Sequence, residues 1–343
     1  MLTILIAASV ALGQSPSGQI AFVHGVSEGV RQVCLLDVGT GEVRPLGAGP
    51  WDGAPVWSPD GSKLAYDGPV DGGSVHVRIV SPDGTPGPEI PHAIAANRSP
   101  AWSPDGTKLA YSSGEGDARR IRDFDFGSNE ESEWGVVENT GDNDPKPKVA
   151  FLRPVWLSNT EIAAVGIRDD KEGRTADLYK IEKDAVTLMV QTRGSGTYVE
   201  WMPAMHARKG ALAYESNDGG DREIFVSAPD RGVIDVSNHR AADWNPVWSP
   251  DGVWIAFESY RGGSRGIYIV TPQRTIVAPV AVDAASDNWS PSWSPDGAWI
   301  AFVSTRTGKP TLHACRAAGS DARALTQHDG DDLAPAWRPV KTK

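Results

Sequence analysis

The chain has 343 residues, of which 40% are hydrophobic and 22% charged, and it contains 37 glycines, 26 prolines and 13 tryptophans. Its formal net charge of −11 repels phosphate backbones, and because we find no local basic patch we expect no nucleic-acid partner. So many turn-forming residues with so few long apolar runs predict many short strands.

The first segment, MLTILIAASVALG at 1–13, is apolar but too short to span a bilayer. It has the length of a secretory signal core and small residues at Ala11-Leu12-Gly13 for cleavage, although no Lys or Arg precedes it. A buried N-terminal strand is the alternative. We expect a signal peptide over 1–13, a mature chain that is periplasmic or secreted, and no membrane insertion after cleavage.

A 14-residue segment then recurs along the chain. Two further copies, at 154–166 and 199–216, have lost the turn sequence but keep the hydrophobic pattern. The clear copies are PVWSPDGSKLAYDG (55–68), PAWSPDGTKLAYSS (100–113), PVWSPDGVWIAFES (246–259) and PSWSPDGAWIAFVS (291–304). The seven unit tryptophans, Trp57, Trp102, Trp156, Trp201, Trp248, Trp293 and Trp337, are 44 to 54 residues apart. This period is typical of four-stranded propeller blades.

Within each unit, Pro-x-Trp predicts an inner strand A and Leu/Ile-Ala-Tyr/Phe predicts strand B. In the Ser-Pro-Asp-Gly turn between them, Pro sets φ, Asp bonds its own backbone and Gly takes the positive φ that closes the hairpin. Strand C follows, as at 223–227 and 266–270, and then strand D, as at 322–326. Such a unit is apolar on both faces, so we expect the tryptophans to pack between blades rather than to bind a ligand.

The order of these strands predicts a closed ring. Trp337 has no strands after it, whereas the chain begins with strand-like segments at 19–23, 33–37 and 42–46. Strand A from the C-terminus and strands B to D from the N-terminus would complete a blade and remove the exposed sheet edges. We therefore predict an all-β fold, a seven-bladed β-propeller of four-stranded antiparallel blades in one domain over 14–343. A six-bladed ring is the alternative.

The two cysteines test this assignment of strands to blades. Cys34 and Cys315 fall on strands C of neighbouring blades, at positions two apart in the repeat, so both side chains point to the same rotational side. They should not face each other, and we predict two free, buried thiols.

The repeated unit P-x-W-S-P-D-G-x-x-[LI]-A-[FY] resembles the TolB-type (WD-like) β-propeller repeat of bacteria. The segment LTQHDGDDLAPAW at 325–337 is similar to that family's link between blades. The resemblance implies an extracytoplasmic propeller. The translocation protein for which the repeat is named has an α/β domain ahead of a six-bladed propeller, and peptidases with similar propellers need an α/β-hydrolase domain. We expect neither domain here.

The sequence holds weak candidates for catalysis. Gly262–Gly266 matches G-x-S-x-G, but it falls in a B to C hairpin turn instead of a strand-to-helix elbow. No histidine pair has the spacing of a zinc site on one helix. We therefore predict no catalytic residues, no metal ligands and no cofactor, with a cation in the central channel as an alternative. A site assembled from several blades would draw on His92, His239 and His328.

A polar position five residues before most unit tryptophans is the better candidate for binding. It lies in the connection from strand D to the next strand A, so its side chains should ring one mouth of the channel. Alternatively, each side chain bonds backbone amides of its own loop. With the two tryptophans that follow it directly, the predicted binding residues are Asp52, Asn97, Asp243, Trp244, Asn288, Trp289 and Asp332.

We expect a monomeric, non-catalytic scaffold that binds a protein or peptide partner of the cell envelope through its channel-mouth loops, because a closed ring holds variable loops on a rigid frame. The competing interpretation is a propeller enzyme, a polysaccharide lyase or hydrolase, with a site built from several blades near the axis. A third is a structural module of an envelope assembly.

Overall fold

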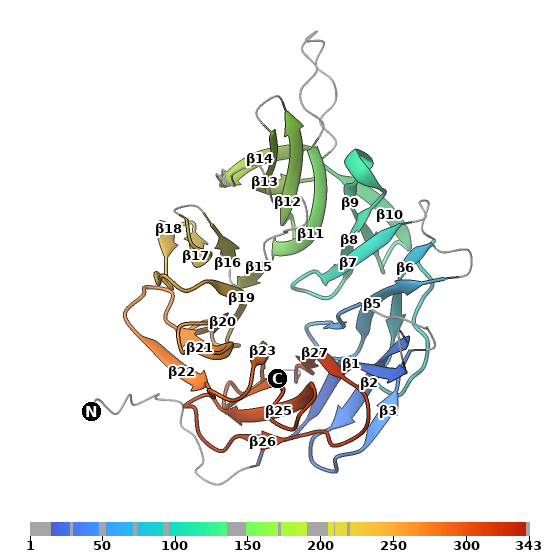
Figure 1. Cartoon of the computed structure of the whole chain (residues 1–343). Coiled ribbons are helices and arrows are strands. Elements are labelled where there is room, and N and C mark those ends of the chain that lie inside the picture. Colours follow the sequence, from blue (N-terminus) through green and yellow to red (C-terminus); the bar gives the residue numbers. More distant parts are fainter. Residues whose placement is uncertain are drawn as a thin grey trace.

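The computed structural model describes residues 15–27, 30–47, 53–70, 74–91, 96–135, 149–170, 173–190, 205–208, 210–217 and 220–340. They form seven antiparallel sheets arranged in a ring (Figure 1). The only helical element of these residues is the short 3-10 turn η1 (Gly116–Ala118), and none of them forms a helix that could cross a membrane. The predicted all-β, seven-bladed propeller is confirmed. The predicted signal peptide, 1–13, lies outside the described residues.

The blades are numbered in chain order, with the first strand of each nearest the centre of the ring (Figure 1). Blade 1 contains β4 (Val56–Trp57), β5 (Leu64–Pro69) and β6 (Val75–Val80); blade 2, β7 (Asn97–Trp102), β8 (Lys108–Ser113), β9 (Arg120–Asp125) and β10 (Glu130–Trp134); blade 3, β11 (Val149–Ser158), β12 (Glu161–Asp170), β13 (Gly173–Glu182) and β14 (Ala185–Val190). Blade 4 contains β15 (Met205–Arg208), β16 (Ala211–Ser216), β17 (Glu223–Ala228) and β18 (Gly232–Asp235); blade 5, β19 (Asp243–Trp248), β20 (Ile255–Ser259), β21 (Gly266–Val270) and β22 (Val277–Ala281); blade 6, β23 (Asn288–Trp293), β24 (Trp299–Ser304), β25 (Thr311–Arg316) and β26 (Arg323–Ala324).

Blade 7 joins the two ends of the chain. Its strand order is β27 (Asp332–Trp337), β1 (Gln19–Ser27), β2 (Val30–Asp37) and β3 (Val43–Pro45), and the blue and red segments meet there in Figure 1. β27 pairs with β1 in antiparallel register, with Ile20 opposite Trp337 and Ala21 opposite Ala336. The predicted closure is confirmed, and the innermost strand of blade 7 comes from the C-terminus.

The Ser-Pro-Asp-Gly turns have the predicted chemistry. In the first copy Ser58 Oγ donates to Asp60 Oδ1 at 2.7 Å, and the same oxygen accepts from the backbone N–H of Ser62 at 3.0 Å. Gly61 has a φ of +68°, which an L side chain rarely adopts. The other three copies repeat this pattern around Asp105, Asp251 and Asp296.

The tryptophans join neighbouring blades. An apolar cluster between blades 6 and 7 contains Trp337 together with Phe22 and Leu312, all nearly or fully buried. The indole nitrogen of most unit tryptophans also bonds the inner strand of the preceding blade, which confirms their packing role. The Nε1 donors and backbone oxygen acceptors are Trp57 and Ala336, Trp102 and Val56, Trp156 and Ala101, Trp248 and His206, and Trp293 and Val247, at 2.9 to 3.1 Å.

Blade 4 differs from the predicted repeat in the position of its inner strand. Its inner strand is β15 (Met205–Arg208) rather than the segment around Trp201, which lies outside the described residues. Ala207 is paired with Leu212 as Trp248 is paired with Ile255, so an alanine occupies the tryptophan position. The tryptophan spacing therefore misplaced the inner strand of this blade.

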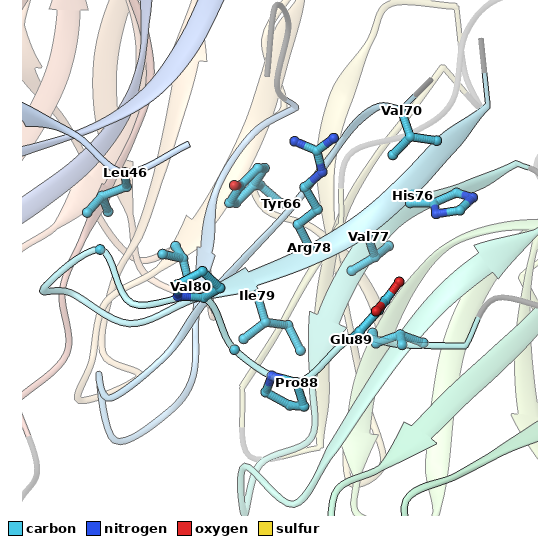
Figure 2. A pocket seen from close by; sticks show the side chains of 14 residues that line it. Leu46, Tyr66, Val70, His76, Val77, Arg78, Ile79, Val80, Pro88 and Glu89 are labelled. Atoms are coloured by element: carbon cyan, nitrogen blue, oxygen red, sulfur yellow. The ribbon is translucent and has the colours of Figure 1, made fainter. Parts of the chain in front are cut away.

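Blade 1 departs from four strands, because its described residues form three. Pro86 and Gly87 make only a bridge and one backbone hydrogen bond to β6, since proline has no N–H to continue a ladder. A cavity of about 320 Å³ lies at this outer edge, and Figure 2 shows Tyr66, Arg78 and Glu89 among its lining side chains.

Both cysteines are free and buried, as predicted. Cys34, on β2, packs with residues of blade 6 such as Leu312, and Cys315, on β25, packs with residues of blade 5 such as Ile269. Each thiol therefore faces the preceding blade, which confirms the shared rotational side.

Candidate functional site

The predicted polar ring lies at the start of the inner strands. Asn97, Asp243, Asn288 and Asp332 are the first residues of β7, β19, β23 and β27, and each is 0% exposed. The surface open to a partner at this mouth therefore comes from neighbouring residues. Asp52 lies outside the described residues. The role of the predicted ring residues in partner binding stays a prediction.

A half-buried arginine contacts this position in blades 5 and 6. Arg261 Nη2 lies 2.6 Å from Asp243 Oδ2, and Arg306 Nη2 donates to Asn288 Oδ1 at 3.1 Å. Each arginine also donates its Nε to the serine that ends strand B, Ser259 in blade 5 and its equivalent in blade 6. Burial raises the pKa of Asp243, and the Ser259 hydroxyl and Arg261 charge oppose that shift. The ring residues thus bond mainly to side chains of their own blades.

The two predicted aromatics are half-buried and contact the preceding blade. The guanidinium of Arg222 lies 5.5 Å from the ring centre of Trp244, and that of Arg265 lies 5.4 Å from the ring centre of Trp289. Both distances are within the range of cation–π attraction. These contacts hold the indoles at the rim of two adjacent blades.

A carboxylate latch, which sequence reasoning missed, fastens each of several inner strands to the blade before it. Asp67, Glu215 and Glu258, all on strands B, accept backbone N–H groups of Ser99, Asn245 and Ser290 at 2.8 to 3.1 Å. The three donor residues have φ between 49° and 56° and precede a proline. An acidic residue ten positions after Trp57 and Trp248 was the available signal.

A cavity of about 690 Å³ lies among the inner strands of blades 1 to 4. Strands β4, β7, β11 and β15 all contribute to its lining, so it belongs to the channel side of the ring. Its wall is mostly apolar, with Val56, Pro100, Trp102, Val155 and Ala207 among the lining residues. A concave apolar wall with a few polar groups is typical of a binding site.

Four ionisable side chains line this cavity. Burial lowers the pKa of His206 to about 4, so its imidazole is neutral at pH 7, and Nδ1 accepts the backbone N–H of Trp248 at 3.3 Å. Burial also raises the pKa of Asp67. Arg208 donates an Nη2 hydrogen bond to the oxygen of Pro250, while its buried Nε has no hydrogen-bond partner among the described residues.

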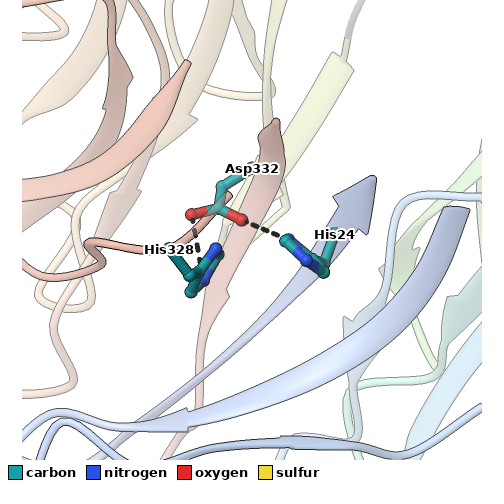
Figure 3. A group of neighbouring side chains, drawn as sticks. All are labelled: His24, His328 and Asp332. Atoms are coloured by element: carbon teal, nitrogen blue, oxygen red, sulfur yellow. Dashed lines mark hydrogen bonds and ion pairs between the residues drawn. The ribbon is translucent and has the colours of Figure 1, made fainter. Parts of the chain in front are cut away.

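A second cluster lies at the join in blade 7. His24 Nδ1 lies 2.9 Å from Asp332 Oδ1, and His328 Nε2 lies 3.6 Å from Asp332 Oδ2 (Figure 3). The hydroxyl of Thr326 donates to the same Oδ2 at 2.5 Å. The three side chains offer ligand atoms within 4.8 Å of one another, which is a geometry that could hold a metal ion.

Two histidines of the predicted multi-blade site, His239 and His328, have separate partners. His239 shares the repeat position of His328, but its backbone N–H bonds Glu223 Oε1 at 2.8 Å in blade 4. His328 contacts Asp332 in blade 7 instead, and His92 lies outside the described residues. The Gly262–Gly266 motif forms the turn between β20 and β21, as predicted, with Ser264 Oγ bonded to the backbone oxygen of Asp283 at 2.6 Å.

Fold and cavity define a closed seven-bladed propeller with a recess on its channel side. Residues 157–343, more than half of the chain, match the model of the TolB beta propeller domain. The chain belongs to this family. None of the curated proteins matches it significantly.

Solved structures share the fold at low sequence identity. TolB from Acinetobacter baumannii has a TM-score of 0.56 and 17% identity, over 94% of this chain and 67% of that one. The β-propeller domain of the Trilobed protease from Pyrococcus furiosus, described as having an open velcro topology, has a TM-score of 0.66 and 13% identity, over 92% and 94%. Oligogalacturonate lyase in complex with manganese has a TM-score of 0.59 and 16% identity, over 92% and 87%.

Proposed function

We propose that the chain is a non-catalytic, extracytoplasmic TolB-like propeller that binds a segment of a protein or peptide partner. The supporting observation is the cavity of about 690 Å³ on the channel side of blades 1 to 4. Its apolar wall suits aliphatic or aromatic side chains, and the guanidinium of Arg208, a lining residue, suits a carbonyl or carboxylate oxygen of the bound segment.

The rigidity of the wall supports recognition. Trp indole bonds join β4 to β7 and β7 to β11, and the Asp67 latch adds a second contact between blades 1 and 2, so three of the inner strands that line the cavity are fastened to one another. A preorganised wall reduces the entropy lost on binding. The apolar N-terminal segment and membership of the TolB family support a location outside the cytoplasm.

The test is affinity capture from an envelope extract of the source organism with the immobilised chain. The variant Ala207→Trp introduces the tryptophan that other blades carry at this repeat position. Its indole would fill part of the cavity. Val253→Trp, at an exposed turn position of blade 5, is the matched control. We expect the wild type and Val253→Trp to retain the same partner and Ala207→Trp to lose it. Equal capture by all three would exclude the cavity as the binding site.

The alternative is a propeller enzyme that acts on polysaccharide, and the shared fold with oligogalacturonate lyase favours it. Against it, His239 and His328 have different partners: the backbone N–H of His239 bonds Glu223, whereas the His328 side chain contacts Asp332. Incubation with oligogalacturonates, with ultraviolet absorbance of unsaturated products as the readout, distinguishes the two. Turnover by the wild type would overturn the non-catalytic proposal.

A further inference from the structure

We propose that His24, His328 and Asp332 form a site for a divalent transition-metal ion, with Zn²⁺ as the best fit, at the join of the ring. Two imidazoles and one carboxylate are ligands that zinc commonly takes, and three protein ligands leave a position for water. Each residue offers one ligand atom, and all three atoms lie within 4.8 Å of one another (Figure 3).

The distances are close to those that binding needs. Zinc–nitrogen and zinc–oxygen bonds of about 2.0 to 2.2 Å place tetrahedral ligand atoms about 3.4 Å apart. The measured separations are 2.9 Å from His24 Nδ1 to Asp332 Oδ1 and 3.6 Å from His328 Nε2 to Asp332 Oδ2. Small side-chain rotations would therefore complete the geometry.

Unsatisfied atoms at the cluster support a missing ligand. Both ring nitrogens of His328 are buried and have no hydrogen-bond partner among the described residues. Buried polar atoms are rarely left in this state. A metal ion on Nε2 would satisfy one of them. The Thr326 hydroxyl, which holds Oδ2 of the fully buried Asp332, is the kind of outer contact that orients a ligating carboxylate.

Comparison with other blades indicates that a cation is needed here. In blade 5 the buried Asp243 is neutralised by Arg261, two residues after the serine paired with it. In blade 7 the residue paired with Asp332 is His24, and Val26 stands at the arginine position. A buried carboxylate without a counter-charge is unfavourable. The bound metal would supply that charge.

The site is open on one side. His328 is half-buried and lines a cavity of about 330 Å³ together with Thr307, Lys309, Gln327 and Asp329. The His328 imidazole borders this cavity, which is therefore the route by which an ion would approach the site. His24 lies on β1 and Asp332 on β27, so the bound ion would also link the first and last strands of the chain.

The test is isothermal titration of the chelator-stripped chain with Zn²⁺, followed by thermal denaturation. We expect one equivalent to bind and the melting temperature to rise, because the ion binds only the folded ring. His328→Gln should weaken binding about 100-fold or more, since even outer contacts of a metal ligand contribute 10- to 100-fold. His239→Gln, at the same repeat position in another blade, should bind like the wild type.

Two results would overturn the site. One is a wild type that shows no saturable Zn²⁺ binding and no change in melting temperature. The other is equal binding by the His328→Gln chain, which would identify adventitious sites elsewhere. His328→Gln decides the outcome without risk to folding, because the His328 side chain is partly exposed and circular dichroism can verify the fold of the variant.

Discussion

The indole Nε1 of Trp57 donates a 2.9 Å hydrogen bond to the backbone oxygen of Ala336, from which it is separated by 279 residues. This bond joins blade 1 to the C-terminal strand of blade 7. The same bond type joins blades 1 and 2 through Trp102 and Val56. The join of the ring is thus built like its other interfaces, and its stability depends on β27.

Trp337 tests this dependence. It is 5% exposed and packs among residues of blades 6 and 7. We expect Trp337→Ala to lower the free energy of unfolding by about 3–5 kcal/mol, because it removes a large buried side chain. Urea denaturation measures this, and Trp244→Ala, a half-buried tryptophan at the rim, should cost less. Equal losses for the two variants would contradict a special role for the closing strand.

Glu258 is the most connected carboxylate latch. Its Oε1 accepts from the Ser290 N–H at 2.8 Å, and its Oε2 lies 2.5 Å from Arg265 Nη2. Because Glu258 is fully buried, Glu258→Ala leaves a guanidinium and an amide without their partner, and we expect a loss of about 3 kcal/mol in the free energy of unfolding.

Chemical denaturation measures this loss, and two further variants serve as comparisons. Glu258→Gln keeps an oxygen acceptor and should be less destabilised. Asp230→Ala removes one partner of an exposed ion pair and should change stability by about 0.5 kcal/mol or less. A loss at Glu258→Ala no larger than at Asp230→Ala would show that the latch contributes nothing.

His206 makes stability depend on pH. Burial lowers its folded-state pKa to about 4, below about 6.5 in the unfolded chain. Between these pH values the unfolded state binds a proton that the folded state does not bind. The stability that neutral His206 contributes is therefore lost as the pH falls from about 6.5 to 4. The shift corresponds to roughly 3 kcal/mol. His206→Asn, which keeps an acceptor for the Trp248 N–H, should lose less stability than the wild type between pH 7.5 and 4.5. Parallel losses would refute the assignment.

The cysteines should be inert in the folded protein. Both thiols are buried, and burial raises the pKa of Cys315 to about 12, so little thiolate is available as a nucleophile. We expect a thiol reagent at pH 8 to modify no cysteine in native buffer and both in urea. Rapid modification under native conditions would contradict the register of strands β2 and β25.

Much of the fold could be predicted because the repeat is local. Trp293, the turn Ser294–Gly297 and strand β24 lie within a dozen residues, so their periodicity and turn chemistry are readable in sequence. Prediction was less exact where that local pattern was lost. Ala207 takes the tryptophan position of blade 4, and the prolines at 86 and 88 interrupt the outer strand of blade 1.

The candidate sites were less predictable. Asn97 and Asp243 were placed at the start of the inner strands by their spacing, but burial of their side chains depends on how blades stack. The cavity of about 690 Å³ combines side chains from four blades. No single segment carries such a pattern, so sequence inspection could not recognise it.

By itself, the sequence determined the blade repeat, the number of blades and the exchange of strands that closes the ring, because hydrophobic period and turn residues act over short distances. Only the tertiary structure decided that His24 meets Asp332, 308 residues away, and that the four inner strands enclose a cavity. Those contacts arise from closure of the whole ring, which sets the distance and burial of side chains that no local pattern relates.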